Sequence, residues 1–210
     1  MKDIKLMGKK IVIDKCKTLF KYTPDENFKE YFVVKAGEWE YKDGYLIGKE
    51  AGNKGGIIYT KEIYNKPVIL IITASTVLPA SRDVNAVFYA SWNEDVNNLG
   101  DSYVSGVGGW YDNKAGLERN LHSGGCSFRA LTNSYNYKAG KEITISQGAI
   151  NGHLFFVVDD ELVMEYIEKD VPLTSGHMGV SPYCTMLKVK EIEIKEIYYE
   201  EVKEGYKPEF

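Results

Sequence analysis

A row of polar side chains at strand spacing gives this sequence its clearest candidate for a chemical site. Glu118, Asn120 and His122 occupy alternate positions, and alternate residues of a β-strand point to the same face of a sheet. A carboxyl, an amide and an imidazole in one row can hydrogen-bond the hydroxyls of a sugar. Glu118 or His122 could also act as a general acid or base. The row therefore predicts a ligand site, with Glu118 and His122 as its catalytic candidates.

Aromatic residues precede this row. Trp110 and Tyr111 carry flat rings that can cover the apolar face of a pyranose, and Tyr89 and Arg129 are expected at the sides of the groove. The strand before Trp110 is rich in glycine, which often marks the close approach of another group. The predicted ligand-binding residues are Trp110, Tyr111, Asn120, Tyr89 and Arg129. An alternative stays open, in which the polar row is the solvated side of an edge strand.

Glycoside hydrolysis usually needs two carboxyl groups, roughly 5–9.5 Å apart. Glu118 can supply one, and Asp112, Glu94 and Asp95 are candidates for the other, among which the sequence does not choose. No histidine has ligand-like spacing to another His, Cys or carboxylate, so no metal is predicted. No glycine-rich phosphate loop is present, and no cofactor is predicted.

Composition excludes several classes of partner. The 210 residues carry a net charge of -4 and a pI near 5.5, which argues against binding to nucleic acid or an anionic membrane. No apolar run has the length of a membrane span or a signal-peptide core. Three cysteines with no paired framework predict reduced thiols and a cytoplasmic protein. The expected partner is a small molecule or oligosaccharide; a homo-oligomer or a partner enzyme subunit stays open.

Strands must position these residues. Turn signals recur at roughly 8–12-residue spacing without a helical period, which is typical of a sandwich or barrel. Residues 67–77 are mostly apolar and predict a central strand covered on both faces. Asp43-Gly44, Asn151-Gly152 and Asp159-Asp160 predict tight turns. Thr23, followed by proline and by Glu26, predicts the start of one short helix.

These patterns predict a single domain over residues 1–210. It is expected to be all-β, an antiparallel two-sheet jelly-roll sandwich with one short N-terminal helix. Its core is expected to contain Val68, Leu70, Ile72, Phe156, Val158, Val189 and Ile194.

The last third of the chain resembles the concanavalin A-like lectin and glucanase superfamily. The residues that carry the resemblance are Val158 to Val163, then Gly176 to Val180, then a closing strand from Leu187 to Ile197. The first third is similar to the 3-keto-disaccharide hydrolase-like and DUF1961 families. It carries Trp39, then Asp43 to Leu46, then a Gly-Gly pair before a long apolar strand. The resemblance implies a jelly roll that acts on or binds carbohydrate.

Two functions follow as expectations. The first is an intracellular carbohydrate-active protein that binds a glycoside or oligosaccharide in a groove on a concave face and cleaves or modifies it. The second is a non-catalytic carbohydrate-binding or accessory-subunit sandwich. The alternating acids of the laminarinase-type signature are absent from the sequence, so an enzyme would need another acid pair.

Overall fold

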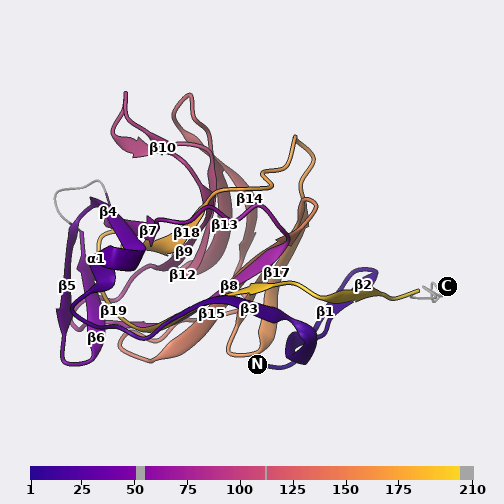
Figure 1. Ribbon diagram of the computed structural model, residues 1–210, viewed down its shortest axis with the longest axis horizontal. Coiled ribbons are helices and arrows are strands. Elements are labelled where there is room, and N and C mark those ends of the chain that lie inside the picture. The colour runs from indigo at the N-terminus through magenta and orange to yellow at the C-terminus, as the bar shows by residue number, and fades with distance from the viewer. Residues whose placement is uncertain (51–54, 112, 204–210) are drawn as a thin grey trace.

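Two large antiparallel sheets pack face to face in the computed structural model, which describes residues 1–50, 55–111 and 113–203 (Figure 1). Within those residues, the seven strands of the first sheet lie in the order β14 (Cys126–Thr132), β13 (Lys114–Asn120), β12 (Ser102–Gly109), β9 (Val84–Ala90), β18 (His177–Ser181), β7 (Ile57–Thr60) and β4 (Phe32–Ala36). The prediction of an all-β antiparallel sandwich is confirmed.

The second sheet has eight strands within the described residues. Seven lie in the order β17 (Glu161–Ile167), β16 (His153–Val158), β15 (Ile143–Ile150), β8 (Val68–Thr76), β19 (Met186–Glu196), β6 (Tyr45–Lys49) and β5 (Glu38–Lys42), and β3 (Lys17–Tyr22) also pairs with β19. The predicted central strand is β8, which lies between β15 and β19.

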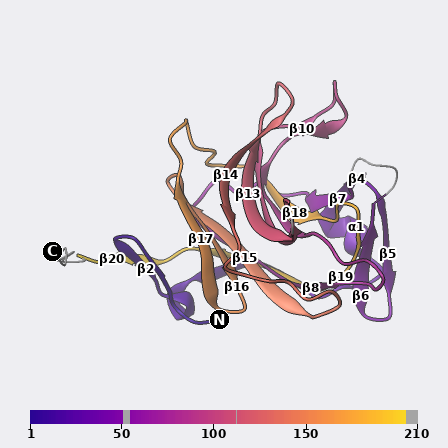
Figure 2. The same cartoon turned by 180° about the vertical axis from the view of Figure 1, so that it is seen from behind.

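Smaller elements add to this pair of sheets. β1 (Ile4–Leu6), β2 (Lys9–Ile11) and β20 (Tyr199–Glu201) form a three-stranded sheet, and a 3-10 turn (Ile13–Lys15) follows β2. They lie at the end of the molecule opposite β5 (Figure 2). β10 (Trp92–Asn93) and β11 (Asn98–Leu99) form a short hairpin. The sequence patterns predicted neither small sheet.

Strand β8 is buried on both faces because two separate clusters cover it. Its residues Val68, Leu70 and Ile72 point into the core between the two large sheets. Ile69 and Ile71 point the other way and pack with apolar side chains of the β1–β2 hairpin. All seven predicted core residues are 0% exposed and lie in the core between the sheets.

The predicted tight turns are confirmed. In two of them, Asn151-Gly152 and Asp159-Asp160, both residues have positive φ, as a two-residue hairpin loop with the right-handed strand twist requires. Asp43 and Gly44 have the same signature. These turns connect β5 to β6, β15 to β16 and β16 to β17.

The helix begins later than predicted. α1 (Phe28–Tyr31) is a single turn whose N-cap residue is Asn27 rather than Thr23. The Tyr22 hydroxyl accepts a hydrogen bond from the backbone N–H of Asp25 at 3.0 Å and donates to its carbonyl oxygen at 3.3 Å. These bonds hold the residues after Thr23 in a loop, so the helix starts only beyond it.

Leu70→Ala is expected to lower the free energy of unfolding by about 2–5 kcal/mol, since Leu70 is fully buried between the sheets and truncation leaves a cavity. Ile63→Ala is the matched control, because Ile63 is 62% exposed and a surface change of this kind costs within about 0.5 kcal/mol. Urea denaturation measures both. Equal effects of the two substitutions would contradict the assignment of the core.

Candidate functional site

A cavity of about 570 Å³ opens on the face of the seven-stranded sheet that points away from the second sheet. Its lining comes from strands near both ends of this sheet, with Phe128 on β14 and Ile57 on β7. In a flat sheet these two strands would lie about 24 Å apart. One cavity touches both, so the sheet curls around it, and the cavity lies on a concave face.

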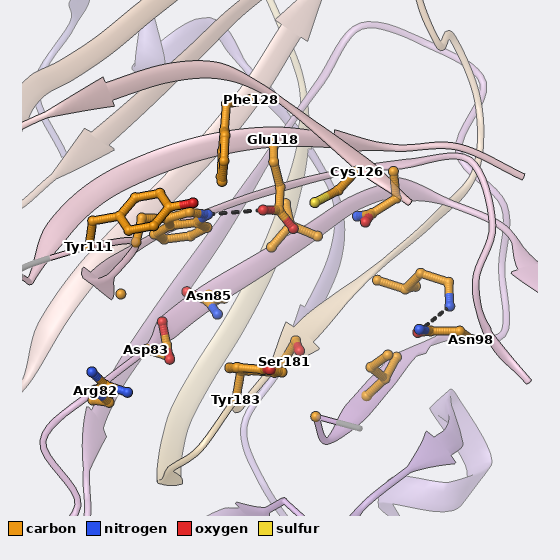
Figure 3. A pocket seen from close by; sticks show the side chains of 17 residues that line it. Arg82, Asp83, Asn85, Asn98, Tyr111, Glu118, Cys126, Phe128, Ser181 and Tyr183 are labelled. Carbon is orange, nitrogen blue, oxygen red and sulfur yellow. Dashed lines mark hydrogen bonds between the residues drawn. The ribbon is translucent and has the colours of Figure 1, made fainter. Parts of the chain in front are cut away.

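Two carboxyl groups face this cavity from different strands. Glu118 is on β13, and Asp83 lies one residue before β9. In Figure 3, Glu118 lies with Cys126 and Phe128 along one wall, and Asp83 lies with Asn85 along the other. The indole Nε1 of Trp110 donates a hydrogen bond to Glu118 Oε2 at 2.9 Å. Neither carboxyl group forms an ion pair with any described residue.

Burial perturbs both acids in the same direction. It raises the pKa of Asp83 to about 7; Arg82 and the Asn85 side chain lower that pKa, while the charge of Glu118 raises it further. Burial also raises the pKa of Glu118, although the hydrogen bonds from Trp110 and Cys126 partly offset this. Acids whose pKa is raised in this way can hold a proton near neutral pH and release it when a ligand binds.

Three glycines make room for the side chains of the site. A Cβ atom at Gly109 would lie 2.0 Å from Asp83 Oδ1, and one at Gly116 would lie 2.4 Å from the Trp110 ring. A Cβ at Gly106 would lie 2.0 Å from Asn85 Oδ1. The glycine-rich strand was predicted to admit a ligand close to the backbone. At these three positions the chain's own side chains take that space.

Strained backbone gathers at the same place. Asp83, Trp110 and Tyr111 have φ values of 52°, 38° and 47°, and all three line the cavity. Bulky residues rarely adopt positive φ, and such strain persists where the surroundings hold the residue in position, often at functional sites. Here Gly109 and Gly116 admit the Asp83 and Trp110 side chains, which lie directly against their backbone.

No protein-family model matches the chain, and no curated protein matches it in sequence. Solved structures do match in shape. The carbohydrate-binding module CBM66 from Bacillus subtilis is 12% identical, with a TM-score of 0.61 over 80% of this chain and 94% of that chain. The endo-β-1,3-glucanase from Pyrococcus furiosus is 10% identical, with a TM-score of 0.59 over 95% of this chain and 100% of the other.

A third similar structure is the exoplasmic/lumenal domain of VIP36 in a form bound to Ca²⁺ and Man3GlcNAc, 10% identical, with a TM-score of 0.62 over 90% of this chain and 92% of that one. This chain has the concanavalin-like jelly-roll fold. Identities this low establish the fold alone, and the narrower resemblance to the DUF1961 and 3-keto-disaccharide hydrolase-like families stays a prediction. The concanavalin-like fold does not specify a function, which depends on the residues of the cavity.

The concanavalin-like sheet brings four of the predicted site residues together. Trp110, Tyr111, Glu118 and Asn120 all line the cavity. Tyr111 is 68% exposed at the rim, and its ring contacts Phe128 edge-on with 5.9 Å between centroids. Strand β13 pairs with β12 on one side and β14 on the other, so the polar row is not on an edge strand.

Tyr89 does not line this cavity. It lies in the core between the sheets, where it is 3% exposed and packs beside Phe88. Strand alternation would place Tyr89 on the same face as Val87, which packs on the cavity side. Tyr89 has a φ of 49°, and this left-handed residue breaks the alternation, so that Phe88 and Tyr89 both point inward.

Arg129 also points away from the cavity, because its neighbour Phe128 lines the cavity and successive side chains of a strand point to opposite faces. The pairing of β13 with β14 shifts between Leu117 and Glu118, and Arg129 is left without a cross-strand partner. Its guanidinium forms ion pairs with Glu168 at 3.1 Å and Asp170 at 2.6 Å. Arg129 thus points toward the end of β17.

His122 lies outside the cavity lining because β13 ends at Asn120. The chain turns there, and the imidazole is on an exposed loop. The backbone carbonyl of His122 accepts a hydrogen bond from the Asn93 side chain at 2.5 Å. Strand alternation therefore does not extend to His122, and its side chain is not among those that line the cavity.

Asp83 was missed by the sequence analysis. It lies two residues before Asn85, so extending the β9 pattern backwards by two positions would have placed both on one face. Of the predicted alternatives for a second acid, Glu94 pairs with Lys35 at 2.9 Å, and neither Glu94 nor Asp95 lines the cavity. Asp112 lies outside the described residues.

Clusters of metal-ligating side chains and membrane-spanning helices were both sought in the described residues. Among the described residues, no three His, Cys, Asp or Glu side chains come together in a way that could hold a metal ion. None of the helices in the described part of the chain is long and apolar enough to cross a membrane.

Proposed function

We propose that this chain binds a carbohydrate in the cavity on the concave face of the seven-stranded sheet. The observation that carries the proposal is the mixture of groups in the lining: aromatic rings at Trp110, Tyr111 and Phe128 beside the acids Glu118 and Asp83. A pyranose has an apolar face that packs on aromatic rings and a ring of hydroxyls that hydrogen-bond carboxylates. Similar solved structures include a carbohydrate-binding module, a glucanase and a domain bound to Man3GlcNAc, which supports the same proposal.

Cleavage of a glycoside is the second candidate function. Glycosidases generally place two carboxyl groups on either side of the scissile bond, one of them with a raised pKa so that it can act as the acid. Asp83 and Glu118 face one cavity from different strands, and the pKa of each is raised. In this proposal they replace the earlier pair of candidates, Glu118 and His122.

Trp110→Ala is expected to weaken binding of a saccharide at least 10-fold, because it removes the ring that lines the cavity and the indole donor to Glu118; tenfold is about 1.4 kcal/mol. Calorimetric titration against a panel of mono- and oligosaccharides measures the loss. Trp92→Ala is the matched control, since Trp92 is a half-buried tryptophan on the same side of the sheet that does not line the cavity. Equal affinity of the wild type and Trp110→Ala would place the site elsewhere.

A further inference from the structure

The protein balances the negative charge of the cavity only in part. Asp83, at 6% exposed, and Glu118 both face the interior of the cavity, and neither has an ion-pair partner among the described residues. Arg82 is the cation in the lining, and it is an exposed residue without a salt bridge to Asp83. Two carboxylates in one partly desolvated cavity repel each other, and each loses hydration energy.

A third acceptor in the cavity lining lacks a hydrogen-bond donor. Asn85 is 5% exposed and lines the cavity, and its Oδ1 atom has no hydrogen-bond partner. A buried acceptor left unsatisfied costs free energy until a donor reaches it. The deep wall of the cavity therefore combines the carboxyl groups of Asp83 and Glu118 with the free amide oxygen of Asn85. The complementary ligand brings hydrogen-bond donors and positive charge.

We propose that the carbohydrate bound in this cavity is an amino sugar whose amino group is free and protonated. This inference rests on the proposed carbohydrate-binding function and names the class of its ligand. An ammonium group supplies three donors and one positive charge, which complements the carboxyl groups of Asp83 and Glu118 that line the cavity. A neutral sugar supplies donors without offsetting the two negative charges. An N-acetylated sugar has lost the charge.

The aromatic lining fits the same ligand. Trp110 and Tyr111 lie beside the acids, and their rings attract a cation in addition to packing on the apolar face of a pyranose. A simple metal cation fits less well, because no group of three ligating side chains exists among the described residues. The two carboxyl groups thus act as the specificity-determining part of the site, and the rings supply contact area.

Proton release accompanies binding in this scheme. Asp83, whose pKa burial raises to about 7, is partly protonated near neutral pH, and the charged groups around it are Arg82, Glu118 and Glu50. An ammonium ion favours the carboxylate form of Asp83, so its arrival displaces the proton. Affinity for the amino sugar is therefore expected to rise as the pH increases from 5 to about 7. A neutral sugar has no charge through which to drive this release.

The experiment compares matched glycosides on the full chain. The probes are the methyl glycosides of glucosamine, galactosamine and mannosamine, each alongside its neutral and its N-acetylated counterpart, titrated by calorimetry at pH 6.5. For at least one of the three sugars, the amino form is expected to bind at least 10-fold more tightly than both counterparts. Repeating that titration in two buffers of different ionisation enthalpy is expected to show release of protons from the wild type.

Asp83→Asn is expected to narrow the preference for the amino form to less than 3-fold and to abolish the proton release. Asp95→Asn, an acid outside the cavity lining, is the control and is expected to retain both. Should Asp83→Asn fail to fold, the two-buffer titration of the wild type decides alone, and no proton release overturns the inference.

Other outcomes separate the two proposals. Neutral sugars that bind as tightly as amino sugars, in a manner that Trp110→Ala abolishes, overturn the amino-sugar inference and leave the proposed function standing. Retention of the full preference by Asp83→Asn also overturns the inference alone. No binding by any of the nine glycosides, or binding that is indifferent to Trp110→Ala, overturns both.

Discussion

Glu118→Gln is expected to lower the turnover of a glycoside substrate by about 10²–10⁴-fold, the usual contribution of a positioned general acid or base. Burial raises the pKa of the Glu118 carboxyl, the direction that favours a general acid. Glutamine has nearly the same shape, and its side-chain oxygen still accepts a hydrogen bond from the Trp110 indole. The fold should therefore stay close to that of the wild type.

Release of the aglycone from chromogenic glycosides, followed alongside calorimetric affinity, measures this effect. Glu94→Gln is the matched control: Glu94 pairs with Lys35 on the surface and does not line the cavity, so the turnover is expected to be unchanged. Unaltered turnover in Glu118→Gln would refute the catalytic role. A wild type that binds saccharides and cleaves none of them would leave the non-catalytic carbohydrate-binding function in its place.

Glu168→Gln is expected to lower the free energy of unfolding by about 3–5 kcal/mol at pH 7, because it removes the shared partner of two buried arginines. The Glu168 side chain is 0% exposed and forms ion pairs with Arg119 at 3.4 Å and with Arg129 at 3.1 Å. Tyr103 donates its hydroxyl to the same carboxylate at 3.1 Å. The backbone N–H groups of the next two residues donate to its other oxygen at 3.0 and 3.2 Å.

The loss of unfolding free energy in Glu168→Gln should be larger at neutral pH than at acidic pH. Burial opposes the ionisation of Glu168, but the hydrogen bonds from Arg129, from the Asp170 backbone and from Tyr103, together with the charge of Arg129, outweigh it and lower the pKa of Glu168. A carboxyl group whose folded pKa is depressed stabilises the fold above its unfolded pKa, and this stabilisation is lost as the pH falls through the folded pKa. The difference between the wild type and Glu168→Gln is therefore expected to shrink below about pH 4.5.

Urea titrations at pH 7 and pH 3.5 measure this difference. Glu142→Gln is the control, because Glu142 forms an exposed ion pair with Lys190 and such pairs contribute about 0–1 kcal/mol. Equal stabilities of Glu168→Gln and Glu142→Gln at pH 7 would contradict a structural role for the buried cluster. Arg119 and Arg129 lie on β13 and β14 next to Glu118 and Phe128, so the cluster also supports the strands that carry one wall of the cavity.

Much of the fold follows from local patterns in the sequence. The apolar run of residues 67–77 predicted strand β8, and the absence of a solvated face predicted its cover on both sides. Turn residues with access to positive φ predicted where three hairpins close. Glu118 and Asn120 were placed together because alternation along one strand decides their face, and Trp110 and Tyr111 lie in the turn that precedes this strand.

The rule that alternate residues of a strand share a face failed where the backbone departs from a regular strand. A positive φ at Tyr89 places two consecutive aromatic side chains in the core. The end of β13 at Asn120 leaves His122 on a loop. Tyr89 has no glycine or proline beside it, so the sequence carried no local sign of that departure, whereas Gly124 and Gly125 mark the turn that follows His122.

The sequence by itself determined the strands, their turns, the core positions and one wall of the site, because each depends on side chains that are neighbours along a strand. Only the tertiary structure decided the opposite wall. Asp83 and Asn85 line the same cavity as Glu118 because β9, β12 and β13 are hydrogen-bonded side by side, and Gly109 and Gly106 of β12 leave room for the Asp83 and Asn85 side chains. Such cross-strand juxtaposition depends on pairing and sheet curvature, which are properties of the whole chain rather than of any segment.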